Sequence, residues 1–243
     1  MKDLVKLVNG TVVECNTAYP GERTNNKDHD KLLENHGWTK YFNVDLLDRD
    51  GSIIFDIPNG KIIKKNYVGS HLLNYDSMLV LSHFKGHPMG GFGGALKQLS
   101  IGCASREGKA YIHSAGKYLD ANKIWNDLPE QNKFLESMAD AAYSVNEYFK
   151  DNIIYINVMR NMSVDCDCCA KAENPCLKDI GILISDDPVA IDFACINLVK
   201  ESNDPGRDHF MERVNSRNGL LTIHAANELG VGSLDYELIN IDK

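Results

Sequence analysis

Short apolar runs on either side of one long amphipathic segment constrain the fold of this chain most. Ser77–Ser82 is a continuous apolar run whose length fits a strand buried on both faces, and Asn152–Val158 and Ile180–Ile184 repeat the pattern. Between the first two, Asn132–Lys150 carries apolar residues at helical spacing. Strands that alternate with helices predict an α/β fold with a mixed, mostly parallel sheet, flanking helices and sandwich-like layers.

Further elements are expected on both sides of these runs. Strands are predicted at Thr11–Cys15, Phe42–Leu47, Ser52–Phe55 and Lys61–Lys65, with hairpin turns at Asp50-Gly51 and Asn59-Gly60. Helices are predicted at Asn26–His36, Ala95–Cys103, Val189–Lys200, His209–Asn215 and Leu221–Leu229. With 243 residues and 43% hydrophobic content, we expect a single domain over residues 1–243.

Charge and cysteine content exclude some classes of partner. The net charge of -8 argues against binding to nucleic acid or to an anionic membrane surface, because both need a basic patch. No apolar stretch approaches the roughly 18–20 residues of a membrane span, and the first ten residues do not read as a signal peptide. The 7 cysteines are odd in number and unevenly spread, which favours a reducing cytoplasm over a disulfide framework.

The densest chemical signal is a cysteine-rich segment, Asp165-Cys166-Asp167-Cys168-Cys169, followed by Cys176. Thiolates are strong ligands for zinc and iron, and Cys166 and Cys168 point the same way if the segment is extended. The spacing matches neither a zinc ribbon nor a complete ferredoxin motif, and an irregular loop with incidental thiols is the alternative. The candidates for the remaining metal ligands are Asp165, Cys15, Cys103 and His113.

A second group of candidates follows the Ser77–Ser82 run. His83, Lys85 and His87 stand at the end of a buried strand, where they suit ligation, proton transfer or anion binding. A glycine-rich loop, Gly86 to Gly94, comes next and opens into a predicted helix. Backbone N–H groups in such a loop can approach an anion, although a tight turn explains the glycines equally well. The candidates for cofactor or anion binding are Gly91, Gly93, Gly94, Lys97 and Arg106, and Lys109 adds local positive charge to Lys97 and Arg106.

Several of these segments resemble the DUF362 family. The resemblance runs in order through Ser82–His87, Gly91–Lys97, Ile101–Arg106, Asp165–Cys168 and, towards the C-terminus, Asp187–Asp192 and Ala226–Gly230. The family is often labelled as iron–sulfur centre proteins, but this chain has no complete ferredoxin motif, so the resemblance does not bring the usual four-iron clusters with it. Many relatives carry a ferredoxin-like insert, which is absent here around residues 117–131. Relatives also tend to start with an additional N-terminal segment, which this sequence does not show.

The resemblance sets the functional hypotheses. The leading one is a cytoplasmic metal-binding enzyme of redox or proton-transfer type, holding zinc or iron and acting on a small anionic molecule. Gly93–Lys97 also resembles the lysine-bearing turn of the nickel-pincer lactate racemase family, without the arginine usually beside that lysine. Two alternatives remain open: a non-catalytic subunit that docks to a ferredoxin or to an N-terminal partner chain, and a metal-free thiol redox switch.

Overall fold

A computed structural model describes residues 2–166, 169 and 171–242 of the chain. The first half holds α1 (Lys2–Leu7), β1 (Val12–Glu14), α2 (Asn26–Asn35), β2 (Val44–Leu46), β3 (Ser52–Asp56), β4 (Lys65–Gly69), η1 (Ser70–Asn74), β5 (Met78–His83), β6 (Lys85–His87), β7 (Gly91–Gly93), α3 (Ala95–Lys97), η2 (Gln98–Gly102) and α4 (Arg106–His113). The second half holds η3 (Ile124–Asn126), α5 (Gln131–Phe149), η4 (Lys150–Asn152), β8 (Ile153–Met159), β9 (Gly181–Ser185), α6 (Pro188–Glu201), α7 (Arg207–Ser216) and α8 (Leu220–Glu228).

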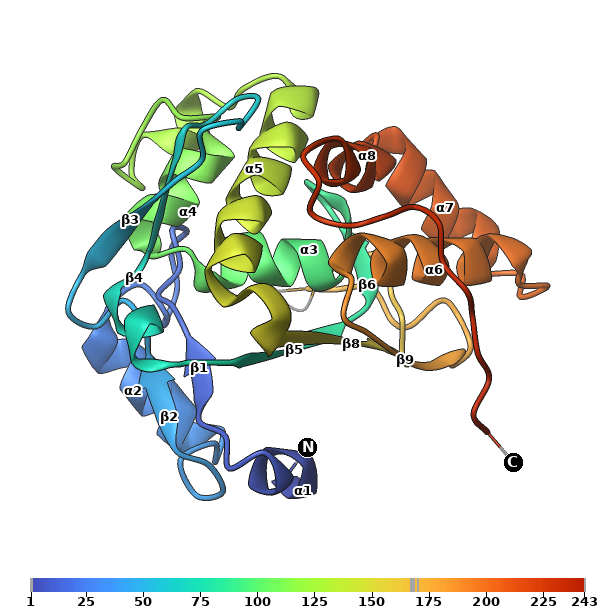
Figure 1. Ribbon diagram of the computed structural model, residues 1–243, viewed down its shortest axis with the longest axis horizontal. Coiled ribbons are helices and arrows are strands. Elements are labelled where there is room, and N and C mark those ends of the chain that lie inside the picture. Colours follow the sequence, from blue (N-terminus) through green and yellow to red (C-terminus); the bar gives the residue numbers. More distant parts are fainter. Residues whose placement is uncertain (1, 167–168, 170, 243) are drawn as a thin grey trace.

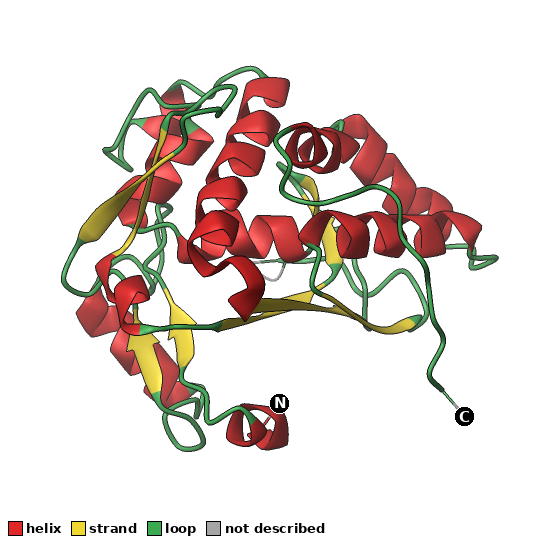
Figure 2. Cartoon of the chain, in the orientation of Figure 1, coloured by secondary structure: helices red, strands yellow, loops and turns green. Residues whose placement is uncertain are grey.

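The predicted α/β class is confirmed, since helices and strands are both present along the chain (Figure 2). The sheets, however, are mixed rather than mostly parallel. The three-stranded sheet has the order β5-β8-β9, with β5 and β8 parallel and β8 and β9 antiparallel. The pair β1–β2 is parallel, whereas β3–β4 and β6–β7 are antiparallel. A parallel neighbour needs a crossover, usually a helix, and the described part of the 160–180 connection contains none, so β9 returns antiparallel to β8.

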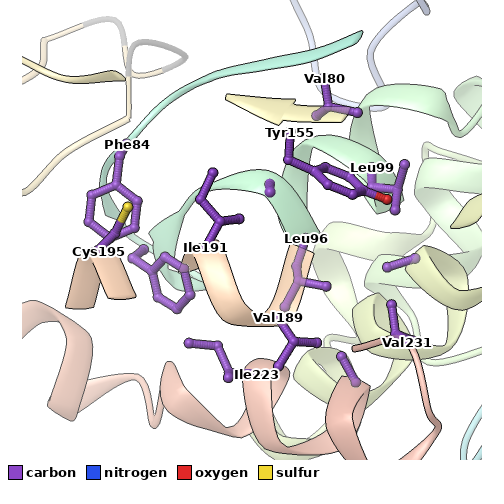
Figure 3. Close-up of a cluster of buried hydrophobic side chains, with 14 of the residues drawn as sticks. Val80, Phe84, Leu96, Leu99, Tyr155, Val189, Ile191, Cys195, Ile223 and Val231 are labelled. Atoms are coloured by element: carbon purple, nitrogen blue, oxygen red, sulfur yellow. The ribbon is translucent and has the colours of Figure 1, made fainter. Parts of the chain in front are cut away.

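The main core lies between the three-stranded sheet and the helices above it. In Figure 1, α3, α5 and α6 all lie on one side of this sheet. Figure 3 shows that Val80 and Tyr155 from the strands meet Leu96 of α3 and Ile191 of α6, all at most 4% exposed. The opposite face of the sheet is apolar and open to solvent, with Ile154, Ile182 and Ile184 exposed.

Two predicted hairpins have different outcomes. The turn at Asn59-Gly60 does lie between paired antiparallel strands, but the second strand is β4 and not Lys61–Lys65. The backbone N–H groups of residues 61–63 donate to the buried Asp140 carboxylate, at 2.7, 2.7 and 2.8 Å, so they are not free for a strand ladder. The hairpin at Asp50-Gly51 was wrong, because β2 pairs with β1 and not with β3.

The glycine-rich loop is itself a hairpin, formed by β6 and β7. Gly91 has a positive φ of 81°, and a Cβ there would lie 2.8 Å from the Cα of Gly219, so this turn requires glycine for backbone reasons. The helix predicted from Ala95 to Cys103 exists as α3 followed by the π-helical η2. Helix α4 was not predicted; it begins after Ser105, whose hydroxyl accepts a hydrogen bond from the Gly108 N–H.

Candidate functional site

His87 and Cys166 form the centre of the candidate site. The Nδ1 atom of His87 accepts hydrogen bonds from the backbone N–H groups of Met89, at 3.2 Å, and Gly90, at 2.9 Å. A ring nitrogen that accepts carries no proton, so the neutral imidazole has its proton on Nε2. Cys166 also hydrogen-bonds to His87. Because Nδ1 of His87 already accepts two hydrogen bonds, the His87 Nε2–H is the group that donates to the Cys166 sulfur.

The surroundings keep His87 neutral at physiological pH. The side chain is 7% exposed, and burial lowers its pKa to about 4, with nearby Lys97 acting in the same direction. Lys85 adds a smaller lowering, whereas Cys166 opposes it. A neutral imidazole with a fixed Nε2–H is suited to donate a hydrogen bond rather than to ligate a metal through that nitrogen.

His113 lies in the same region with the opposite tautomer. Its Nδ1–H donates to the carbonyl of Lys109 at 2.6 Å, and its ring stacks on Phe134 at 5.1 Å. The lone pair therefore sits on Nε2, which has no hydrogen-bond partner among the described residues. The pKa of His113 is lowered to about 4, mainly by burial, and Lys97, His87 and Lys109 contribute in the same direction against the hydrogen bond to the Lys109 carbonyl. These four groups therefore lie within electrostatic range of one another.

The segment that carries Cys166 is fastened to the rest of the protein on two sides. Gly86 of β6 donates its N–H to the carbonyl of Ser163 at 2.8 Å. From α7, Nη1 of Arg213 donates at 3.0 Å both to the carbonyl of Val164 and to the Asp165 carboxylate. The ion pair with Arg213 holds the pKa of Asp165 below its usual range, so this predicted metal ligand is engaged with Arg213.

Two other predicted metal ligands, Cys15 and Cys103, contact each other in the protein interior. Cys15 donates its thiol to the carbonyl of Cys103 at 3.5 Å, and both side chains are 5% exposed. Burial raises the pKa of Cys15 far above its usual range and that of Cys103 to about 12, so both are thiols at neutral pH. Within the described part of the chain, no three His, Cys, Asp or Glu side chains are grouped so as to hold a metal ion.

Cys168 and Asp167 lie outside the described residues. The described side chains therefore do not by themselves fit a zinc or iron site, and metal binding through Cys166 and Cys168 stays a prediction of the sequence.

The glycine-rich hairpin leads into a helix whose first N–H groups already have an acceptor. Asp192, fully buried in α6, accepts from the backbone N–H groups of Ala95 at 2.7 Å and Leu96 at 3.0 Å. A Cβ on Gly94 would lie 2.3 Å from Asp192 Oδ1, so glycine is needed there for close approach. The start of α3 is therefore occupied by an internal carboxylate, and Lys97 is the group of this segment whose positive charge acts on His87.

The predicted residues His83 and Lys85 stand at the edge of this cluster. Nε2 of His83 hydrogen-bonds to the carbonyl of Arg160 at 2.7 Å, and Lys85 Nζ donates to the carbonyl of His83 at 3.3 Å. Lys85 acts on the pKa of His87, so it belongs to the cluster electrostatically. A surface hollow of about 510 Å³ lies apart from it and is lined by Asn146, Glu147, Lys150, Asp151, Asp186, Asp187 and Val231.

Of three further residues near the site, the sequence indicated Lys109 as local positive charge and Asp192 as a possible acid, and it gave no signal for Arg213. Lys109 is 6% exposed, Arg213 holds the cysteine-rich segment, and Asp192 caps α3. Lys109 stands three residues after Arg106 and four before His113, a spacing that places all three on one face of a helix. A prediction of helix α4 would therefore have grouped them. No sequence pattern connects Asp192 to Ala95 or Arg213 to Asp165, because each pair is distant along the chain.

Comparison with known proteins gives the chain a family but no assigned activity. A family model described as a domain of unknown function, DUF362, matches residues 1–197, from α1 through most of α6. No curated protein and no solved structure matches the chain. Among the described helices, none is both long and apolar enough to cross a membrane. With four fifths of its length matched, the chain belongs to the DUF362 family.

Proposed function

We propose that this protein is an enzyme that transfers a proton on a small anionic molecule. The observation that supports this most is the hydrogen-bonded pair of His87 and Cys166 beside Lys97. A hydrogen-bond donor and a nearby ammonium are the kinds of neighbour that favour a thiolate over a thiol. The pair thus combines a potential base with a fixed hydrogen-bond donor, next to a cation that attracts an anion.

In this proposal each side chain has a distinct task. Lys97 holds the anionic group of the substrate and offsets the negative charge that develops on it. The Cys166 thiolate removes a proton from the carbon beside that group, which gives a thiol and a carbanion stabilised as its enolate. Return of a proton to that carbon regenerates the thiolate. Throughout, His87 donates its Nε2–H to the sulfur and so sets the basicity of the thiolate.

The test is hydrogen–deuterium exchange in D₂O with a panel of small carboxylic acids, followed by proton NMR. We expect the wild type to catalyse exchange at the carbon beside a carboxylate. His87→Asn should lower the rate by about 10²-fold, because an asparagine Oδ1 can still accept from Met89 and Gly90 but presents no Nε2–H to Cys166. Cys166→Ser should remove exchange altogether.

His36→Asn is the matched control, since His36 is an exposed residue at the end of α2. It should exchange at the wild-type rate. Two results would show that the His87–Cys166 pair does not transfer protons. One is a folded wild type that catalyses hydrogen–deuterium exchange in none of the acids, and the other is a His87→Asn variant with the wild-type exchange rate.

The other hypotheses drawn from the sequence stay predictions. They are zinc or iron bound through the cysteine-rich segment, docking to a ferredoxin or an N-terminal partner chain, a thiol redox switch and a cytoplasmic location. For the switch, the buried thiols of Cys15 and Cys103 are unfavourable, because thiolates rather than thiols react with oxidants.

A further inference from the structure

Helix α4 presents three nitrogen-bearing side chains on one face. Arg106, Lys109 and His113 stand at positions i, i+3 and i+7, which align along an α-helix. His113 belongs to the candidate site described above, so this face runs from that site towards the start of the helix. In Figure 1, α4 lies beside α5 and β4.

Lys109 is buried without a negative partner. It is 6% exposed, and its Nζ donates at 2.6 Å to one acceptor, the neutral carbonyl of Ala104. Within the described part of the chain, Lys109 forms no ion pair with a carboxylate. An ammonium needs three acceptors and loses much solvation when buried, so this arrangement is costly unless an anion joins it.

The neighbouring acids are already engaged. Glu14, which lies near enough for Lys109 to influence its pKa, hydrogen-bonds to His29 at 2.9 Å and faces Arg23 at 3.7 Å. The buried carboxylate of Asp48 accepts the backbone N–H of Asn16 and that of Arg106. Neither acid is thus placed as a dedicated counterion for the ammonium.

Arg106 and His113, the other two groups on this face, each have a nitrogen atom without a hydrogen-bond partner among the described residues. The Nε–H of Arg106 is buried and has no hydrogen-bond partner among the described residues. Nε2 of His113 carries a lone pair that is likewise unengaged in the described structure. Lys97 and Lys109 both lower the pKa of His113, so the ring lies within electrostatic range of two positive charges.

We propose that this face of α4 binds an oxyanion, the carboxylate or phosphate of a small ligand, with Lys109 as its counterion. Arg106 donates a second hydrogen bond to the oxyanion. The inference deepens the proposed function, because it adds an anchor for an anionic group beside the His87–Cys166 pair. Anion binding is measured without turnover, so its failure is distinguishable from a failure of proton transfer.

The test measures binding of inorganic phosphate and of oxalate by calorimetry and by thermal unfolding, at an ionic strength kept constant with sodium chloride. We expect one of the two anions to bind the wild type and to raise its Tm. Lys109→Met should weaken that binding by about tenfold or more, whereas Lys109→Arg, which keeps the charge, should retain most of it. Oxalate binding would indicate a carboxylate ligand, and phosphate binding a phosphorylated one.

Lys123→Met is the matched control, because Lys123 is exposed. It should bind like the wild type. Without added anion, Lys109→Met should be at least as stable as wild type, since methionine replaces a buried charge with an apolar chain of similar length. The proposal is overturned if neither anion raises the wild-type Tm beyond sodium chloride, or if Lys109→Met responds as the wild type does.

Discussion

Replacing Asp192 with alanine is expected to lower the free energy of unfolding by about 3–5 kcal/mol at pH 7. Burial raises the pKa of this carboxyl to about 6, so it is mainly ionised at that pH. It accepts from the N–H groups of Ala95 and Leu96 and from Nδ2 of Asn157, at 2.7, 3.0 and 2.7 Å. The alanine variant leaves these three donors buried without an acceptor.

Chemical denaturation followed by circular dichroism measures this loss. Asp192→Asn should fall between the wild type and alanine, because its single oxygen can accept while its NH₂ group faces other donors. Asp186→Ala is the matched control, since Asp186 is exposed and close along the chain, and it should stay within about 0.5 kcal/mol of wild type. An alanine variant as stable as the wild type would mean that water or a rearranged backbone satisfies the start of α3.

The parts of the fold that could be predicted from the sequence are those with a strong local period. Helix α5 was predicted because its apolar residues recur at helical spacing, and β8 because it is a continuous apolar run. The pairing of β2 with β1 was missed, since the turn at Asp50-Gly51 favours a local hairpin and no local signal specifies a distant parallel partner. The start of β4 was missed because Asp140, some 78 residues away in sequence, takes the N–H groups of residues 61–63.

The same limit applies to the candidate site. His87 and Lys97 could be chosen because they stand at the end of a strand and the start of a helix, where α/β proteins place their ligands. The tautomer of His87 depends on the backbone N–H groups of Met89 and Gly90, so it could not be predicted from the sequence. The sequence indicated Lys109 as local positive charge together with Lys97 and Arg106, but its burial could not be predicted from the sequence.

Buried carboxylates give the site a rigid frame. Asp192, Asp140 and Asp48 each accept at least two backbone N–H groups from a segment distant in sequence: the start of α3, residues 61–63, and the positions Asn16 and Arg106. These bonds fix two loop segments, at Asn16 and at residues 61–63, and the first residues of helices α3 and α4. Since Lys97 belongs to α3 and Arg106 opens α4, two of the three carboxylates hold the elements from which the candidate site is built.

Replacing Gly86 with alanine is expected to separate Cys166 from His87. Gly86 lies directly against the cysteine-rich segment: a Cβ there would stand 2.3 Å from the carbonyl oxygen of Val164 and 2.6 Å from its Cα. Because these are backbone atoms, the whole segment must move by about an ångström or more, and such a displacement of a reacting group costs on the order of 10²-fold in rate. We also expect a loss of stability of about 2–3 kcal/mol from the strain.

The most direct measurement is alkylation of Cys166 by iodoacetamide, located by peptide mass mapping. At 6% exposure the wild-type side chain should react slowly, and in Gly86→Ala its rate should rise more than about tenfold as the segment detaches. Gly102→Ala is the matched control, since its Cβ would meet only the flexible end of Gln98. Equal protection of Cys166 and equal stability in Gly86→Ala would show that the contact with Val164 is not what seats Cys166 against His87, and that Arg213 holds the segment alone.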